Sequence, residues 1–162
     1  MSNPHGYTKT DLVIAFAIIL VATVIIVFIA NPARRLAERN DVVREDGVRD
    51  IMEVMLEMFY DDSTTFAAMI EPTAYDRVMI GTGEGCAGDF GLLCGDEAIS
   101  DDCFNLSTSA IPDYISELPV DPNDEIYSVE ASGYYLEFVD GALYVGACNP
   151  EARDEVILWN KF

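Results

Sequence analysis

The sequence predicts an α+β protein in which a long N-terminal helix packs on a small antiparallel β-sheet. Three observations support this prediction: an uninterrupted apolar stretch at residues 12–30, an amphipathic helical pattern after residue 32, and aromatic, β-branched runs near the C-terminus. At 162 residues, the chain is long enough for one globular domain of ordinary size in addition to the apolar stretch. We therefore expect one membrane anchor followed by one folded head.

The apolar stretch, residues 12–30, contains a single polar side chain, the hydroxyl of Thr23. Its 19 residues, at about 1.5 Å each, form a helix just long enough to cross the hydrocarbon core of a bilayer. A cleaved secretory signal is the alternative, but its apolar core is usually shorter and a small-x-small cleavage site is missing. We expect this stretch, residues 12–30, to be a retained transmembrane helix.

After Asn31 the pattern becomes amphipathic. Apolar residues recur near helical spacing between charged ones as far as residue 60: Leu36, Val43, Val48, Ile51, Met55 and Phe59. This pattern predicts one long helix that continues out of the membrane, with a kink near Pro32, which lacks a backbone donor. Residues 61–65 should end the helix. Residues 67–109 are rich in Gly, Asp and Cys, and predict an irregular connector with a short strand at 78–80.

The C-terminal third contains the clearest strand signals. Residues 134–139 and 142–147 are aromatic and β-branched runs separated by Asp140-Gly141, a pair typical of a two-residue hairpin turn. A third strand is predicted at 156–159. Three antiparallel strands with one apolar face need a cover, and the amphipathic half of the long helix can provide it.

The formal net charge of −20 is unevenly distributed. Five of the nine basic residues lie between Arg34 and Arg49, whereas the chain from Asp50 onward has 24 acidic and three basic residues. Because such a surface repels phosphate backbones, we expect the head not to bind nucleic acid. The abundance of Asp would also suit a salt-rich habitat, where high ionic strength screens the repulsion.

Four cysteines follow the apolar stretch without Cys-x-x-Cys spacing: Cys86, Cys94, Cys103 and Cys148. A zinc or thioredoxin-like site therefore loses its main support. In an exported head we expect disulfides, and three pairings of the four cysteines are open. We favour Cys94 with Cys103, because these two residues bracket a short loop rich in Asp and Gly that has few apolar residues to hold it.

No group of residues indicates catalysis. The only histidine, His5, lies before the apolar stretch, and no nucleophile–base pair can be assigned. Acid pairs such as Asp61-Asp62 are expected by chance among 29 acidic residues. We therefore expect a protein that is not an enzyme and that has no organic cofactor.

A candidate calcium site lies at residues 121–125. Four of these residues offer hard oxygen ligands within one predicted loop, which suits Ca²⁺: Asp121, Asn123, Asp124 and Glu125. The alternative is an acidic turn that precedes a strand and binds no metal.

A short motif, Gly6-Tyr7-Thr8-Lys9-Thr10-Asp11, comes just before the apolar stretch. A carboxylate at the start of a membrane helix is costly in lipid, so Asp11 needs a partner or a position at the interface. The simpler interpretation is that Asp11 caps the helix at the headgroups. The motif also resembles the prepilin cleavage and methylation motif, Gly-Phe-Thr-Leu-Ile-Glu followed by an apolar helix. In that resemblance, Gly6 precedes the cut, Tyr7 becomes the new N-terminus and Asp11 takes the acidic position.

Two further segments extend the resemblance to type IV pilins and pseudopilins. Asn31-Pro32-Ala33-Arg34 is similar to their Asn-Pro-Ala-Lys/Arg, and residues 103–123 are similar to their segment from Cys-x-x-Leu-Ser to Pro-x-Asp-Pro. The resemblance implies a pilin-like fold in three parts. These are a leader (1–6), a transmembrane and filament-core helix (7–31), and an extracytoplasmic head (32–162) with an amphipathic helix half (32–60) and a C-terminal sheet (126–160).

The resemblance implies a structural function. A prepilin peptidase would cut after Gly6, and Asp11 of one subunit would pair with the Tyr7 amine of a neighbour in a homo-oligomeric filament at the cell surface. A pilus or secretion assembly platform would be a further partner, and residues 121–125 would correspond to the calcium loop of major pseudopilins. The motif departs from the family in its Asp, in Lys9 and Thr10, and in a leader without Lys or Arg. The alternative is a minor pilin or a membrane-anchored adhesion module that does not form the filament body.

Overall fold

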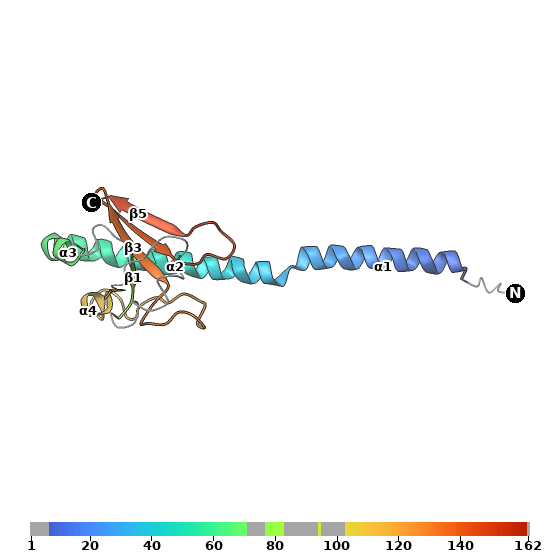
Figure 1. Cartoon of the computed structure of the whole chain (residues 1–162), viewed down its shortest axis with the longest axis horizontal. Coiled ribbons are helices and arrows are strands. Elements are labelled where there is room, and N and C mark those ends of the chain that lie inside the picture. The colour runs from blue at the N-terminus through green and yellow to red at the C-terminus, as the bar shows by residue number, and fades with distance from the viewer. Residues whose placement is uncertain (1–6, 71–76, 83–93, 95–102, 162) are drawn as a thin grey trace. The chain divides into compact units, whose positions relative to one another are not determined.

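The computed structural model describes residues 7–70, 77–82, 94 and 103–161. The chain divides into two compact units, Met1–Leu36 and Ala37–Phe162. Helix α1 (Lys9–Ala30) lies in the first unit, and α2 (Pro32–Asp61) begins there and lies mostly in the second (Figure 1). We refer to the second unit as the head.

The predicted long helix is present, and it is interrupted at Asn31, next to the predicted kink at Pro32, so that it consists of α1 and α2. Helix α1 ends because Asn31 leaves the helical conformation, with φ −27° and ψ 89°. Asn31 then starts α2, since its backbone oxygen accepts from the Arg35 N–H at 3.3 Å and its side-chain oxygen from the Arg34 N–H at 3.3 Å. Pro32 is the first residue of α2, where its missing N–H would have had no helical partner.

The head contains a five-stranded mixed sheet in the order β2-β1-β3-β4-β5. Its strands are β1 (Val78–Ile80), β2 (Cys103–Phe104), β3 (Tyr134–Val139), β4 (Ala142–Ala147) and β5 (Ile157–Lys161). Strands β1 and β2 are parallel, and the other neighbouring pairs are antiparallel. The α+β class with a long N-terminal helix is confirmed. The sheet differs from the predicted three antiparallel strands: β1 and β2 add to one edge, and their parallel pairing makes the sheet mixed.

Strands β3 and β4 form the predicted hairpin, in register from Tyr134 opposite Ala147 to Val139 opposite Ala142. Asp140 and Gly141 have positive φ values of 54° and 76°, as a type I′ turn requires. The short strand at 78–80 is also confirmed, and the last strand is displaced toward the C-terminus of its predicted position.

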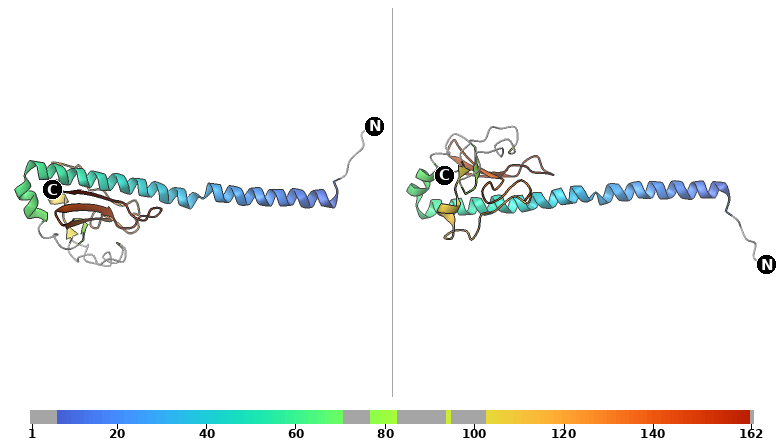
Figure 2. Two further views of the ribbon diagram at one scale, coloured as in Figure 1. Left: turned by 90° about the horizontal axis from the view of Figure 1, so that it is seen from above. Right: turned by 60° about the horizontal axis from the view of Figure 1, so that its bottom comes forward.

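Helix α2 covers one face of the sheet (Figure 2). Its residues Val48, Ile51 and Met55 are fully buried, in one apolar cluster with side chains of β3 and β4. Gly47 permits the close approach of helix and sheet, because a Cβ at this position would collide with the Tyr134 hydroxyl. The predicted role of the amphipathic helix as a cover is therefore confirmed.

Two short helices occupy positions where an irregular chain was predicted: α3 (Ser63–Ile70) and α4 (Ser107–Ala110). The carboxylate of Asp62 accepts from the backbone N–H groups of Thr64 and Thr65 at 3.0 and 3.1 Å, and thereby caps α3. Phe66 and Ile70, four residues apart on α3, are buried in the core of the head. One turn of apolar spacing is too short to predict a helix from sequence.

Candidate functional site

Helix α1 begins with a capping box between Thr8 and Asp11. The Asp11 carboxylate accepts from the Thr8 backbone N–H at 2.9 Å and from the Thr8 hydroxyl at 2.8 Å, and the Asp11 N–H donates to that hydroxyl at 3.2 Å. The two side chains therefore accept the backbone N–H groups of Thr8 and Asp11, which have no carbonyl partner within the helix. Tyr7 is 94% exposed, and Gly6 lies outside the described residues.

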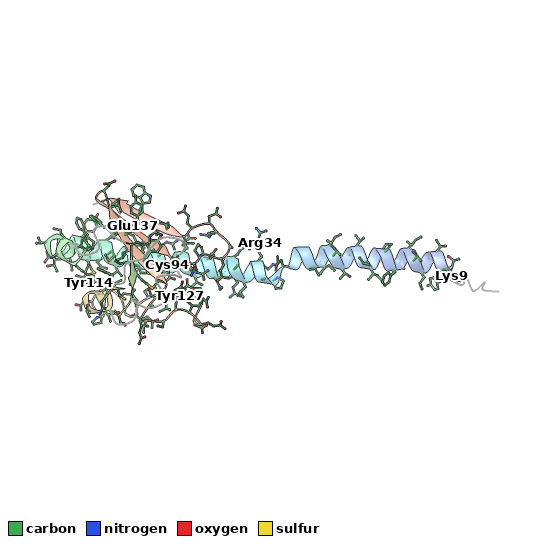
Figure 3. The ribbon with its side chains drawn as sticks, in the orientation of Figure 1. Lys9, Arg34, Cys94, Tyr114, Tyr127 and Glu137 are labelled. Atoms are coloured by element: carbon green, nitrogen blue, oxygen red, sulfur yellow. A yellow bond between two sulfur atoms is a disulfide. The ribbon has the colours of Figure 1, made fainter. Side chains whose placement is uncertain are left out.

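The apolar side chains of α1 project outward on all sides of the helix (Figure 3). Leu12 is 72% exposed and Val21 58% exposed, and the other large apolar side chains described on this helix are similarly exposed. The Thr23 hydroxyl donates to the Ile19 carbonyl at 2.8 Å, so this polar group has a partner within the helix. By length and composition the helix could span a membrane.

A buried ionic cluster joins α2 to two loops of the head. We define the Arg44 cluster as Arg44, Asp41, Asp121 and Glu151. The Arg44 guanidinium binds both oxygens of Asp121 at 2.7 and 3.0 Å, Asp41 at 2.8 Å and Glu151 at 2.8 Å. Arg44, Asp41 and Asp121 are buried, with 1%, 0% and 2% exposed, whereas the side chain of Glu151 is 37% exposed at the edge of the cluster. With one cation among three carboxylates, the cluster is held by bidentate and charge-assisted hydrogen bonds.

Asp41 has further partners that stabilise its charged form. Its carboxylate accepts the backbone N–H groups of three successive residues, Glu151, Ala152 and Arg153, at 2.7–2.9 Å. Burial raises the pKa of Asp41, but these hydrogen bonds and the one from Arg44 outweigh it and hold the pKa below its ordinary value. The polar groups are mutually satisfied, which indicates a structural role for the Arg44 cluster rather than a chemical one.

The Arg44 cluster was not predicted, although half of it is visible in the sequence. Asp41 and Arg44 fall on the same helical stripe as Val48, Ile51 and Met55, at spacings of three and four residues. Charged residues on the buried stripe of an amphipathic helix imply partners in the head. The identity of those partners could not be predicted, since Asp121 is 77 residues from Arg44.

The candidate calcium loop contributes to this cluster. Both carboxylate oxygens of Asp121 are bound by Arg44, and one of them also accepts the Asn123 N–H at 2.9 Å. Asp124 and Glu125 are exposed. Among the described residues, no group of three or more His, Cys, Asp and Glu is arranged to hold a metal ion. A calcium site at this loop would therefore lack Asp121 as a ligand.

The predicted Cys94–Cys103 disulfide is wrong. Cys94 pairs with Cys148, 54 residues away, at a Cα–Cα distance of 4.1 Å. Cys148 directly follows β4, and both cysteines are buried in a second apolar cluster with Met79, Tyr127 and Tyr135. The fold thus brings Cys94 to the end of a strand, whereas proximity in sequence suggested a local loop. Cys103 is also disulfide-bonded, and Cys86 lies outside the described residues.

No protein-family model, no curated protein and no solved structure matches this chain.

Proposed function

We propose that this chain is a membrane-anchored structural subunit of a type IV pilus-like or pseudopilus-like filament, and that it assembles through α1. The exposure of α1 carries the proposal: its long apolar side chains are exposed on all sides, whereas the head buries its own core. An apolar helix of this kind needs an apolar environment, which lipid or other copies of the helix can supply. The segments that resemble prepilins at residues 6–11 and 31–34 support the same function.

Processing and assembly follow from the resemblance. A prepilin peptidase removes residues 1–6, which frees the amine of Tyr7. In the membrane, α1 serves as an anchor, and in the filament the α1 helices of many copies pack together and exchange lipid contacts for one another. Asp11 of one copy pairs with the Tyr7 amine of a neighbour, and its hydrogen bond to the N–H of Thr8, the residue after Tyr7, keeps the carboxylate at this end of the helix.

The proposed location of the head is extracytoplasmic. The Cys94–Cys148 disulfide supports this location, because disulfides persist in oxidising compartments and are rare in the cytosol. The pilus or secretion assembly platform is the proposed partner in the membrane. The function is structural, without enzymatic activity and without nucleic-acid binding by the head.

Substitutions at Asp11 and Thr8 separate assembly from helix capping. Asp11→Asn keeps a side-chain oxygen that can accept from Thr8 but removes the charge, whereas Thr8→Val removes the hydroxyl of the capping box and keeps the charge. We expect Asp11→Asn to lower the yield of filaments sheared from native cells severalfold, and Thr8→Val to lower it much less. The unfolding of the head should not change in either variant.

Mass spectrometry of wild-type filaments should show Tyr7 as the N-terminal residue. If Asp11→Asn cells yield as many filaments as the parent, Asp11 is a helix cap only. If sheared wild-type filaments lack the chain or contain it in trace amounts, it is not the body-forming subunit, and the minor or purely anchored role applies instead.

A further inference from the structure

The head has a groove of about 490 Å³ beside α2 that is lined by both apolar and acidic residues. Leu118 is buried and Ile115 partly buried, whereas Asp50 of α2 and Glu117 are exposed. Neither of these carboxylates makes a hydrogen bond or an ion pair with another described residue, and the described residues that line the groove include no basic one. The groove therefore presents uncompensated negative charge next to apolar surface.

A segment of opposite character lies near the start of α2. We define the basic segment as the exposed residues Arg35, Leu36, Arg39, Val42 and Val43. Arg35 and Arg39 are four residues apart and so share one side of the helix. Leu36 is 58% exposed, and Val42 and Val43 are each 49% exposed. The basic segment thus combines positive charge with apolar side chains, as the groove combines negative charge with apolar surface.

The other arginines of the head are already engaged within the described part of the chain. Arg44 is buried in its cluster, and ion pairs join the remaining three to acids of the head: Arg49 to Glu45 and Asp46, Arg77 to Glu137, and Arg153 to Glu45. Because the head is strongly acidic, two heads repel each other over most of their surface. Among the described arginines of the head, Arg39 is thus the one that is not already paired with an acid of its own chain.

Arg39 cannot reach Asp50, the groove residue on its own helix. Asp50 and Arg39 lie on the same helix, 11 residues apart, which corresponds to about 16 Å along the axis at about 1.5 Å per residue. This separation exceeds the reach of an arginine side chain. An arginine of the basic segment that pairs with Asp50 must therefore come from another molecule.

We propose that the groove binds the basic segment of a second copy of this chain, with Arg39 paired to Glu117 or Asp50 and Leu36 in contact with the apolar part of the groove. This inference rests on the proposed function, because it describes how neighbouring subunits meet outside the packed α1 helices. The contact sets the relative position of two subunits through complementary charge.

Charge exchange in the native host tests the pairing. Arg39→Glu and Glu117→Arg should each lower the yield of sheared filaments severalfold, and the double variant should restore most of it. Asp124→Arg is the matched control, since Asp124 is exposed and does not line the groove. The combination of Arg39→Glu with Asp124→Arg should not restore the yield. Wild-type yields in both single variants, or no recovery in the Arg39→Glu/Glu117→Arg double variant, would overturn the inference.

A crosslinking experiment tests the same contact without relying on filaments. In membranes that contain Arg39→Lys, a zero-length carbodiimide should join the new amine to Glu117 or Asp50. Mixed ¹⁴N and ¹⁵N copies should show the link between different molecules. Crosslinks in membranes from a host without filaments would support the contact while the filament proposal fails. The absence of crosslinks in both membranes and filaments would overturn the contact alone.

A lipid surface is the rival occupant of the basic segment. Vesicles with and without phosphatidylglycerol, mixed with the purified full chain, measure this alternative. If Arg39→Glu weakens binding to the anionic vesicles and the crosslinks are absent, the basic segment binds lipid headgroups and the inference is wrong. If vesicle binding is unchanged and the crosslinks form, the second copy is the occupant.

Discussion

The two compact units of this protein show opposite patterns of burial. In α1 the apolar side chains are exposed, as in Leu12 at 72%, whereas the head buries the guanidinium of Arg44 so that only 1% remains exposed. The head satisfies its buried charges with its own carboxylates and backbone donors. Helix α1 has no apolar partner of its own among the described residues. This contrast predicts that substitutions in the head change its folding stability. Substitutions in α1 should instead change membrane localisation and assembly.

The largest expected effect is the loss of Arg44. Arg44→Met leaves Asp41 and Asp121 buried without their cation, and breaking a buried ion pair in this way costs about 3–5 kcal/mol. Denaturant unfolding of the full chain in detergent micelles, followed by near-ultraviolet circular dichroism, measures the change. Arg49→Met is the control, because Arg49 is exposed and its pairs with Glu45 and Asp46 should contribute at most about 1 kcal/mol. Equal losses in the two variants would contradict a special role for the Arg44 cluster.

A charge at the centre of α1 should weaken membrane insertion and leave the stability of the head unchanged. Val21→Asp places a carboxylate in the middle of the apolar stretch, where membrane insertion is disfavoured by about 3 kcal/mol. We expect a lower fraction of the protein in the membrane after carbonate extraction, together with unchanged unfolding of the head. Val21→Leu should behave as the parent does. If Val21→Asp lowers the stability of the head instead, the folding of the head depends on α1, and the expected independence of the two units is wrong.

Acid should lower the unfolding free energy by less than the loss of Arg44 does. Hydrogen bonds hold the pKa values of Asp41 and Glu151 below their ordinary values of 3.8 and 4.5. These groups therefore contribute stability above those values, and the contribution declines as pH falls through the lower folded pKa values. Unfolding free energies of the full chain should be flat near neutral pH and fall below about pH 4.5.

Asp41→Asn provides the control for the pH profile. It removes one of the titrating groups of the cluster, so the decline in acid should be shallower than in the parent. A variant whose profile has the same slope as the parent would show that other carboxylates of the head account for the acid sensitivity.

The features that could be predicted from sequence depend on neighbouring residues. The hairpin follows from two β-branched and aromatic runs with Asp140-Gly141 between them, and the cover helix follows from apolar spacing in α2. Each signal lies within a single helix or a single hairpin, so no knowledge of the tertiary fold was needed. The same holds for the apolar length of α1.

The features that were missed depend on contacts between distant segments. Cys94 and Cys148 are 54 residues apart, and Arg44 and Asp121 are 77 residues apart. Strand β2 has only two residues, which is too short for a strand pattern in the sequence, and it is recognised only by its pairing with β1. At the candidate assembly site, sequence identified Asp11, and the simpler of its two interpretations, a helix cap, is the one seen in the isolated chain.

The hydrogen bond from Thr23 to the Ile19 carbonyl has a mechanical consequence for the proposed filament. Thr23 is the one polar side chain of the apolar stretch, and because its hydroxyl is satisfied within its own helix, neighbouring helices gain no polar group on which to align. Apolar contacts between such helices are nearly equivalent when one slides along the other, so their axial stagger must be fixed at the ends of the stretch. In the proposed filament, that stagger would therefore depend on the Asp11–Tyr7 pair at one end of the stretch and on the heads at the other.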